Sequence, residues 1–406
     1  MAGPLAGIKV VELGVWVAAP AAGGILADWG ADVIKIEPPQ GDPARMFGRM
    51  LQIDTGQNPP FEMDNRSKRS IVIDLTAVDG MAVALELLAD ADVFVTNVRP
   101  GALARLGLAF GALAERNPRL VYGLITGYGT DGPDADRAAY DVAAFWARSG
   151  LADLLTRPGD TPPFQRGGMG DHSAGMTLAA AICAALVARQ SSGEGQLVTT
   201  SLYRQGAYTV SFDLNTLLLT GQQVAIGQRE TMGNPCMNNY ATADGKRFWI
   251  VGLQGERHWP ALCRAVGHTD WLTDDRYATA RGRALHATDL IAELDAVFAS
   301  RPLDEWATVF AGEPDFFWSP INSIDDVLAD EQFHAAGGIV YVPDGDGTQP
   351  MIATPADFGG TPWEPRSPAP GLGEHTDEIL AEIADRRSRG EGSAGRPVRA
   401  PRGEPV

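Results

Sequence analysis

Short apolar runs alternate with helix-like segments through the first 130 residues, and this alternation restricts the possible folds more than any other feature. Strands are predicted at residues 8–13, 31–37, 70–74, 91–95 and 120–125. Helices are predicted at residues 20–29 and 77–89. Strands that alternate with helices favour an α/β fold with a Rossmann-like, doubly wound parallel sheet. Such a sheet binds ligands at the carboxyl ends of its strands.

The remaining sequence predicts a second, smaller α+β domain. Helical segments at 171–189 and 202–219 flank a strand at 196–200. Residues 240–251 predict a hairpin, and helices are predicted near 256–266, 288–299 and 303–311. The predicted organisation is a large Rossmann-like domain (1–200), a linker helix (201–225), the small α+β domain (226–325), a return linker with the last part of the large domain (326–385), and a disordered tail (386–406). The tail carries six Arg and two Glu without periodicity.

Charge and cysteine content exclude several classes of partner. The chain has 33 basic and 51 acidic residues, a net charge of −18, so neither nucleic acid nor an anionic membrane is expected to be a partner. Three scattered cysteines, Cys183, Cys236 and Cys263, indicate neither a disulfide framework nor a metal site. No secretory leader and no stretch of 18 uncharged apolar residues is present, so a cytoplasmic protein is expected.

Two short motifs resemble catalytic signatures but lack their context. Residues 127–132 read Gly-Tyr-Gly-Thr-Asp-Gly after a predicted strand, but Pro133 follows and nearby aspartates would repel a pyrophosphate. A tight glycine turn is the preferred interpretation. Ser173 lies in Asp-His-Ser-Ala-Gly, which lacks the first glycine and the preceding strand of a hydrolase nucleophile elbow.

Asp171 precedes an apolar helix, where aspartate is a favoured N-cap. Three features indicate more than a cap. Glycines at 167, 168 and 170 leave room for a bulky ligand. The positive end of the helix is expected to keep the carboxylate ionised and nucleophilic, and its free N–H groups could stabilise an oxyanion.

Collinear motifs over residues 4–385 resemble the class III CoA-transferases, of the CaiB/BaiF type. This family includes formyl-CoA:oxalate and carnitine CoA-transferases and the α-methylacyl-CoA racemases. The motifs are Pro4-Leu-Ala-Gly-Ile-Lys-Val-Val-Glu12, Gly30-Ala-Asp-Val-Ile-Lys-Ile-Glu37, Asn65-Arg-Ser-Lys-Arg-Ser-Ile71, Asn97-Val-Arg-Pro-Gly-Ala-Leu-Ala-Arg105-Leu-Gly107, Thr126-Gly-Tyr-Gly129 and Gly170-Asp171-His-Ser-Ala-Gly-Met176.

The resemblance implies transfer of CoA from an acyl-CoA thioester to a carboxylic acid, through anhydride and thioester intermediates on Asp171. It implies no permanent cofactor and no metal, with CoA acting only as substrate. The implied active-site lining is Tyr140, Trp16, Val17, Gly168 and Gly170. The implied CoA contacts are Ala18, Ile71, Val72, Asn97 and Arg105, with Arg99, Lys68 and Arg69 as nearby cations.

Departures from the family pattern bear on the substrate and on the alternatives. Pro38 stands where the oxalate enzyme has a basic CoA contact, and Val17, beside Trp16, stands where it has a glutamine. An apolar acyl pocket is therefore expected, with Phe316-Phe317-Trp318 as a second candidate lining. Racemases carry histidine where Tyr140 stands, and a tyrosine is a poor base at neutral pH, so the racemase alternative is less favoured. A non-catalytic acyl-CoA binding protein is the remote alternative.

The resemblance also implies a homodimer of two interlocked chains. The apolar segment 210–219 would suit a linker helix buried against the partner chain.

Overall fold

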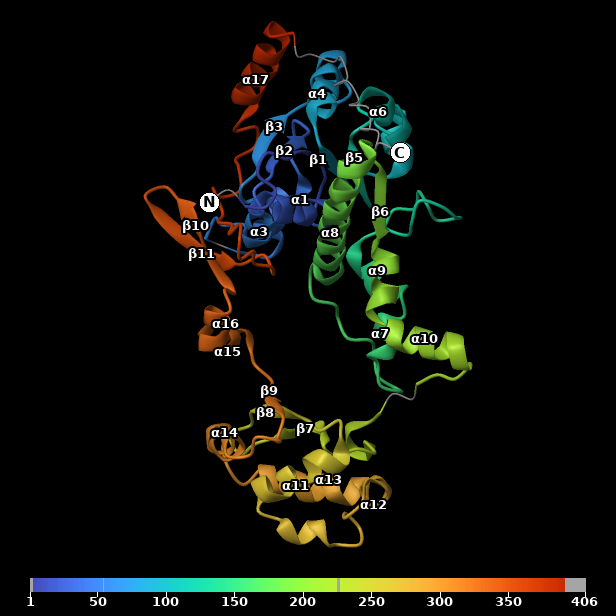
Figure 1. Cartoon of the computed structure of the whole chain (residues 1–406), viewed down its shortest axis with the longest axis vertical. Coiled ribbons are helices and arrows are strands. Elements are labelled where there is room, and N and C mark those ends of the chain that lie inside the picture. Colours follow the sequence, from blue (N-terminus) through green and yellow to red (C-terminus); the bar gives the residue numbers. More distant parts are fainter. Residues whose placement is uncertain (1–2, 54, 225–226, 391–406) are drawn as a thin grey trace, which may run out of the picture. The chain divides into compact units, whose positions relative to one another are not determined.

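Six parallel strands form one sheet in the order β3-β2-β1-β4-β5-β6 in the computed structural model (Figure 1). The structure describes residues 3–53, 55–224 and 227–390. The strands are β1 (Lys9–Leu13), β2 (Asp32–Glu37), β3 (Arg69–Val72), β4 (Val93–Thr96), β5 (Val121–Thr126) and β6 (Leu197–Ser201). This is the predicted doubly wound arrangement, in which the strand order reverses between β1 and β4.

Side-chain alternation along the strands divides the core of this sheet into two layers. Val10 and Val33 face one side, whereas Val11 and Ile34 face the other. Because helices cover both faces, the strands are apolar on both sides. The first layer contains α1 (Ala18–Asp28) and α8 (Met169–Ser192). The second contains α4 (Val78–Asp90), α5 (Pro100–Arg105), α6 (Phe110–Arg116) and α17 (Thr376–Ser388).

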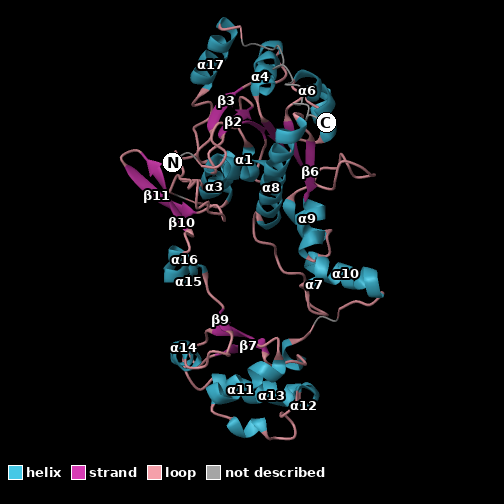
Figure 2. Cartoon of the chain, in the orientation of Figure 1, coloured by secondary structure: helices cyan, strands magenta, loops and turns pink. Residues whose placement is uncertain are grey.

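Two compact units divide the chain. The large unit contains this sheet and comprises residues 1–222 and 335–406; the small unit comprises residues 223–334. The other helices of the large unit are the 3-10 helix η1 (Pro43–Met46), α2 (Phe47–Met50), α3 (Pro59–Asn65), the π-helix η2 (Val142–Ala147), α7 (Leu151–Leu154), α9 (Leu202–Thr209) and α10 (Ser211–Thr220). The antiparallel hairpin of β10 (Ile339–Asp344) and β11 (Gly347–Ile352) is also part of it (Figure 2).

An antiparallel three-stranded sheet, in the order β7-β8-β9, forms the small unit together with its helices. Its core is aromatic, with Tyr240, Phe248, Phe298 and Phe310 in mutual contact. The strands are β7 (Met237–Ala241), β8 (Arg247–Val251) and β9 (Trp318–Pro320). The helices are η3 (Arg229–Thr231), α11 (Gly255–Val266), η4 (Thr269–Leu272), α12 (Ala280–Leu285), α13 (Ala287–Phe298), α14 (Leu303–Ala311) and α15 (Ile324–Ala329), with α16 (Glu331–Ala335) ending at the unit boundary.

Two sequence expectations were wrong in detail. The predicted helix at 202–219 is two helices, α9 and α10, because Val210 leaves the helical conformation between them. The predicted tail begins inside α17, where Arg386 and Arg387 pair with Asp90 and Glu86, so residues 386–388 are helical. The rest of that prediction, residues 391–406, lies outside the described residues.

Candidate active site

The carboxyl ends of β1 and β4 flank the point where the strand order reverses, which is where such sheets bind ligands. Asn97 follows β4 and holds the loop that follows β1. Its side-chain Oδ1 accepts the Val15 N–H at 3.0 Å, and its Nδ2 donates to the Val15 carbonyl at 2.8 Å. Asn97 therefore fixes this loop at the reversal point.

Trp16, the next residue of this loop, has a left-handed backbone conformation with φ of 64°. That conformation is unusual for a bulky residue and is found where the surroundings hold it. The Asp42 Oδ1 accepts the Trp16 N–H at 3.0 Å. The indole packs against Phe47 at 5.4 Å and Tyr140 at 6.1 Å between ring centroids. Trp16 and the exposed Tyr140 are thus brought together, while Val17 is buried beneath them at the start of α1.

A fully buried charge network lies beneath this loop. Glu12 on β1 pairs with Lys35 on β2 at 2.9 Å and with Lys68 at 2.7 Å. Lys35 also pairs with Asp42 at 2.9 Å, which links the network to Trp16. The expectation that Lys68 is a cation near CoA was wrong, because its ammonium is enclosed by Glu12, Asn65 and the Pro20 carbonyl.

Asp171 is the third residue of α8 and not its N-cap, which is Gly168 with φ of 76°. Helix α8 approaches α1 closely because both present small residues. A Cβ at Gly175 would lie 2.9 Å from the Ala21 Cβ and 3.0 Å from the Ala18 carbonyl oxygen. This approach brings the amino end of α8, and with it Asp171, to the start of α1 at the carboxyl edge of the sheet.

The surroundings of Asp171 disfavour its ionised form. Burial raises the pKa of Asp171, the negative charges of Asp141 and Asp64 raise it further, and His172 partly offsets them; the result is about 7. Desolvation and like charge therefore oppose the helix end, which was expected to keep this carboxylate ionised. A carboxylate with a raised pKa is a stronger base and a stronger nucleophile once ionised.

The backbone N–H groups of Gly170 and Asp171 are not free. The Asp141 Oδ2 accepts the N–H of Gly170 at 3.0 Å and that of Asp171 at 3.4 Å. The expectation that these groups serve as oxyanion donors was therefore wrong for this structure, because a carboxylate already occupies them. Gly170 permits this contact, since a Cβ there would overlap both Asp141 and Phe145.

Sequence reasoning missed three residues around Asp171: Asp141, His172 and Asp64. His172 Nε2 lies 3.1 Å from Asp64 Oδ1 of α3. Burial opposes the protonation of His172, but the hydrogen bond to Asp64 and the nearby carboxylates outweigh it and raise its pKa. The adjacency of His172 to Asp171 was a visible signal, whereas the pairing with Asp64 joins positions 108 residues apart. The Ser173 hydroxyl donates to the Met169 carbonyl at 2.7 Å.

The residues expected to bind CoA fall into three groups. Ala18 and Ile71 are buried, so only their backbones are available, and Val72 is half-buried at the carboxyl end of β3. Asn97 lies at the reversal point. Arg99 and Arg105 are exposed at the two ends of α5 and have no ion-pair partner among the described residues.

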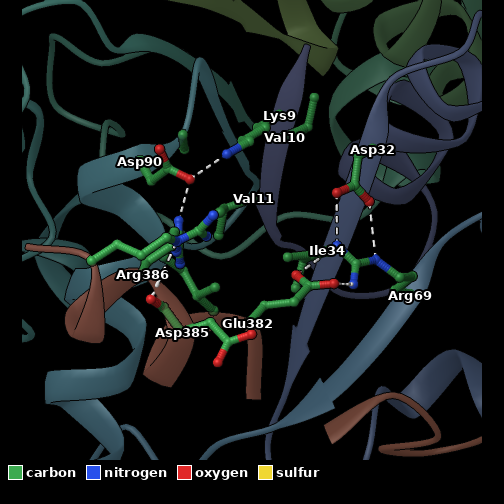
Figure 3. Close-up of a pocket in the computed structure, with 13 residues that line it drawn as sticks. Lys9, Val10, Val11, Asp32, Ile34, Arg69, Asp90, Glu382, Asp385 and Arg386 are labelled. Atoms are coloured by element: carbon green, nitrogen blue, oxygen red, sulfur yellow. Dashed lines mark hydrogen bonds and ion pairs between the residues drawn. The ribbon is translucent and has the colours of Figure 1, made fainter. Parts of the chain in front are cut away.

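Arg69 belongs elsewhere, so its expected proximity to CoA was wrong. It is the first residue of β3, at the amino end of the sheet, and pairs with Asp32 and Glu382 at 2.7 Å and with Glu378 at 2.8 Å. Figure 3 shows it lining a cavity with Lys9 and Asp90. Lys9, Asp32 and Arg69 all begin their strands. This cavity therefore lies opposite the ligand-binding edge. Lys9 and Arg386 pair there with Asp90, and Arg69 pairs with Asp32 and Glu382.

Several other expectations can be placed. Gly129 and Gly132 adopt positive φ, and no helix begins directly after residues 127–132. This segment is therefore a glycine turn, as predicted, and lacks the helix that a dinucleotide-binding loop requires. Among the described residues no cluster of His, Cys, Asp or Glu could hold a metal ion. Phe316 and Trp318 pack into the core of the small unit, and Phe317 is exposed against His258.

Helix α8 is long and apolar enough to cross a membrane by length and composition, the one such helix in the described part of the chain. This is weak support for a membrane span, since core helices have the same properties. Its residues Ala174, Leu178 and Ile182 are fully buried with α1 and the sheet, as in the core of a doubly wound fold.

Comparison with known proteins agrees with the fold. Residues 5–376 match the model of CoA-transferase family III. The (R)-2-hydroxy-4-methylpentanoate CoA-transferase of Clostridioides difficile is 34% identical over 93% of this chain and 95% of its own length. The cinnamoyl-CoA:phenyllactate CoA-transferase of Clostridium sporogenes is 32% identical over 93% of this chain and 92% of its own.

A solved structure gives the same result. The crystal structure of a CAIB/BAIF family protein from Brucella suis superimposes with a TM-score of 0.83 at 31% identity, covering 94% of this chain and 100% of that one. The chain belongs to CoA-transferase family III and is an enzyme that transfers CoA from an acyl-CoA thioester to a carboxylic acid.

Proposed function

We propose that Asp171 carries the transfer covalently. The observation behind this proposal is a half-buried carboxylate with a pKa of about 7, directly after Gly168 and Gly170 at the carboxyl edge of the sheet. The carboxylate attacks the thioester carbonyl and forms an anhydride, and CoA leaves as a thiolate. The thiolate attacks the aspartyl carbonyl, releasing the first acid and leaving an aspartyl thioester. The acceptor acid then takes the CoA through a second anhydride.

CoA is proposed to bind across the ends of β1, β3 and β4. Arg99 and Arg105 supply unpaired positive charge for its phosphates, in a chain whose net charge is −18. Val72 and the backbones of Ala18 and Ile71 supply apolar and polar contacts at the same edge. Pro38, directly after β2, offers no cation, so the arginines of α5 are the proposed substitutes.

The acyl group is proposed to be apolar and of medium length or branched. Trp16, Tyr140 and Val17 gather at the loop after β1, and no glutamine is present there to pair with a small dicarboxylate. The two relatives named above act, by their names, on a branched and an aromatic hydroxy acid.

A panel of acyl-CoA donors and free acids, read by mass spectrometry of the CoA esters, tests this preference. We expect 4-methyl-2-hydroxypentanoate or phenyllactate to exceed oxalate, formate and succinate as acceptors by at least about tenfold in kcat/KM, because a lost apolar contact is worth ~1–3 kcal/mol. Oxalate with formyl-CoA as the best pair would refute the apolar pocket. Deuterium uptake at the α-carbon without change of acyl group would instead indicate the racemase reaction.

We propose that the enzyme is an interlocked homodimer. Helix α10 has no buried residue, and it exposes Phe212, Leu218 and Leu219 by 76%, 79% and 86%. An apolar helix of this kind needs a covering surface. We expect sedimentation at micromolar concentration to give about twice the 43.1 kDa chain mass and no folded monomer. A folded monomer under those conditions would contradict this proposal.

The enzyme is further proposed to work in the cytoplasm without a bound cofactor. Its three cysteines are free, which is typical of a reducing compartment. The covalent mechanism needs only the Asp171 carboxylate and the two substrates.

A further inference from the structure

Asp141 places a second carboxylate against the backbone that carries Asp171. Its Oδ2 accepts two N–H groups, those of Gly170 and Asp171. Its Oδ1 is buried and has no hydrogen-bond partner among the residues that the structure describes. One oxygen therefore holds the amino end of α8, while the other has no donor to offset its charge.

The local backbone fixes Asp141 in this position. Asp141 directly precedes the π-helix η2, a rare form that is frequent at functional sites. Phe145 of this π-helix and the Asp141 carboxylate both lie against Gly170, where a Cβ would overlap them. The carboxylate is therefore held against α8 by packing as well as by its hydrogen bonds.

Three titratable side chains act on the Asp171 carboxyl. Asp141 comes from the segment before η2, Asp64 from α3, and His172 from α8 itself. After burial, the charge of Asp141 is the largest influence that raises the Asp171 pKa, and it exceeds the opposing influence of His172. His172 lies 3.1 Å from Asp64, whereas Asp141 has no ion pair among the described residues and its Oδ1 has no hydrogen-bond partner there.

We propose that Asp141 is a positioning residue that uses its charge to drive Asp171 toward its uncharged, covalently loaded form. This inference rests on the proposed function of Asp171. The physical reason is that two carboxylates held together repel, and the repulsion disappears when either becomes neutral. Loading with CoA neutralises Asp171 as effectively as a proton does.

The charge balance of the loading step supports this reasoning. An Asp171 oxygen forms a bond to the acyl carbonyl carbon as the bond from that carbon to sulfur breaks, and the negative charge leaves with the CoA thiolate. The thiolate then bonds to the Asp171 carboxyl carbon as its bond to the bridging oxygen breaks, and the first acid departs as a carboxylate. Asp171 ends as a neutral thioester beside a charged Asp141, and the charge has moved away from the pair.

Asp141→Asn tests the proposal, because an asparagine oxygen can still cap α8 while the charge is lost. The measurement is single-turnover formation of the aspartyl thioester from acyl-CoA as a function of pH. We expect the rate of thioester formation to rise with pH. The midpoint of this rise should lie near pH 7 for the wild type and at least about one pH unit lower for the variant. Above both midpoints, the equilibrium constant for loading should be about tenfold lower in the variant for each unit of that shift.

Asp326→Asn is the matched control. Asp326 likewise accepts a backbone N–H at a helix start, that of Ser323, but it lies in the small unit. This variant should leave the midpoint unchanged. An Asp141→Asn enzyme that is slower at every pH with an unmoved midpoint would overturn the proposal and leave Asp141 as a helix cap only.

Stability measurements keep the test independent of catalysis and of whether Asp141→Asn folds. Asp171 has a folded pKa above its unfolded value of 3.8, so its contribution to stability is present at low pH and lost as pH rises to about 7. Asp171→Asn should therefore unfold at higher urea concentration than the wild type at pH 8. An equally or less stable variant would contradict the unfavourable charge at Asp171 on which the proposal depends. Loss of transfer in Asp171→Asn tests the proposed function separately, so the two failures are distinguishable.

Discussion

Replacing Asp171 by asparagine is expected to lower the rate of CoA transfer at least ~10³-fold, which corresponds to ~4 kcal/mol of activation free energy. The amide keeps the shape of the side chain but cannot attack a thioester as a carboxylate does. Because Gly168, and not Asp171, is the N-cap of α8, the substitution removes no helix cap. Folding and CoA binding should therefore persist, and the loss should appear in turnover alone.

Mass spectrometry of the same enzymes gives the direct measurement. Wild-type protein incubated with acyl-CoA should carry an adduct on the peptide that contains Asp171, and hydroxylamine should trap it. Asp171→Asn and Asp171→Ala should show neither adduct nor turnover. Near-normal transfer by the asparagine variant would falsify the assignment; Ser173 would then be tested next, although its hydroxyl is bonded to the Met169 carbonyl.

Replacing Glu12 by glutamine is expected to lower the free energy of unfolding by ~3–5 kcal/mol, the usual effect of removing one partner from a buried ion pair. The buried network holds two carboxylates, Glu12 and Asp42, and two ammonium groups, Lys35 and Lys68. The variant leaves it with one uncompensated positive charge from which water is excluded. Urea unfolding at fixed protein concentration, followed by circular dichroism, measures the change.

The double variant Glu12→Gln with Lys68→Met is the informative control, because it restores neutrality in the network. It should recover most of the lost stability. Glu86→Gln, which breaks an exposed pair with Arg387, should change stability far less. If Glu12→Gln matched this surface variant, the network would not be a major source of stability.

Much of the large unit could be predicted from the sequence because its strands are short apolar runs between clear breaks. The periodic segments around Val10, Val33 and Val121 became β1, β2 and β5, and both faces are covered as such runs require. Asp171 was found for a similar reason, since glycines surround it at the start of a long apolar helix. These signals are local in the chain.

Features that depend on distant residues were not predicted. Lys68 was predicted to be a cation near CoA, yet it pairs with Glu12 inside the core, beside a second buried pair of Lys35 and Asp42. The end of α17, residues 386–388, was assigned to the tail because its stabilising pairs join Arg386 to Asp90 and Arg387 to Glu86, far apart in the chain. The pKa of Asp171 depends on Asp141, thirty residues earlier in the chain. Secondary-structure propensity and the spacing of residues along the chain do not indicate such pairings.

The return of the last segment to the large unit has a consequence for how the protein is made on the ribosome. The six strands are complete once Ser201 has emerged, but the buried Arg66 binds the Ile352 carbonyl, and Asp28, its ion-pair partner, bonds to Thr354. These groups lie some 286 and 326 residues beyond their partners. A nascent chain must therefore keep an unfinished first domain while the inserted one is synthesised, a period in which it is open to misassembly and to chaperone binding.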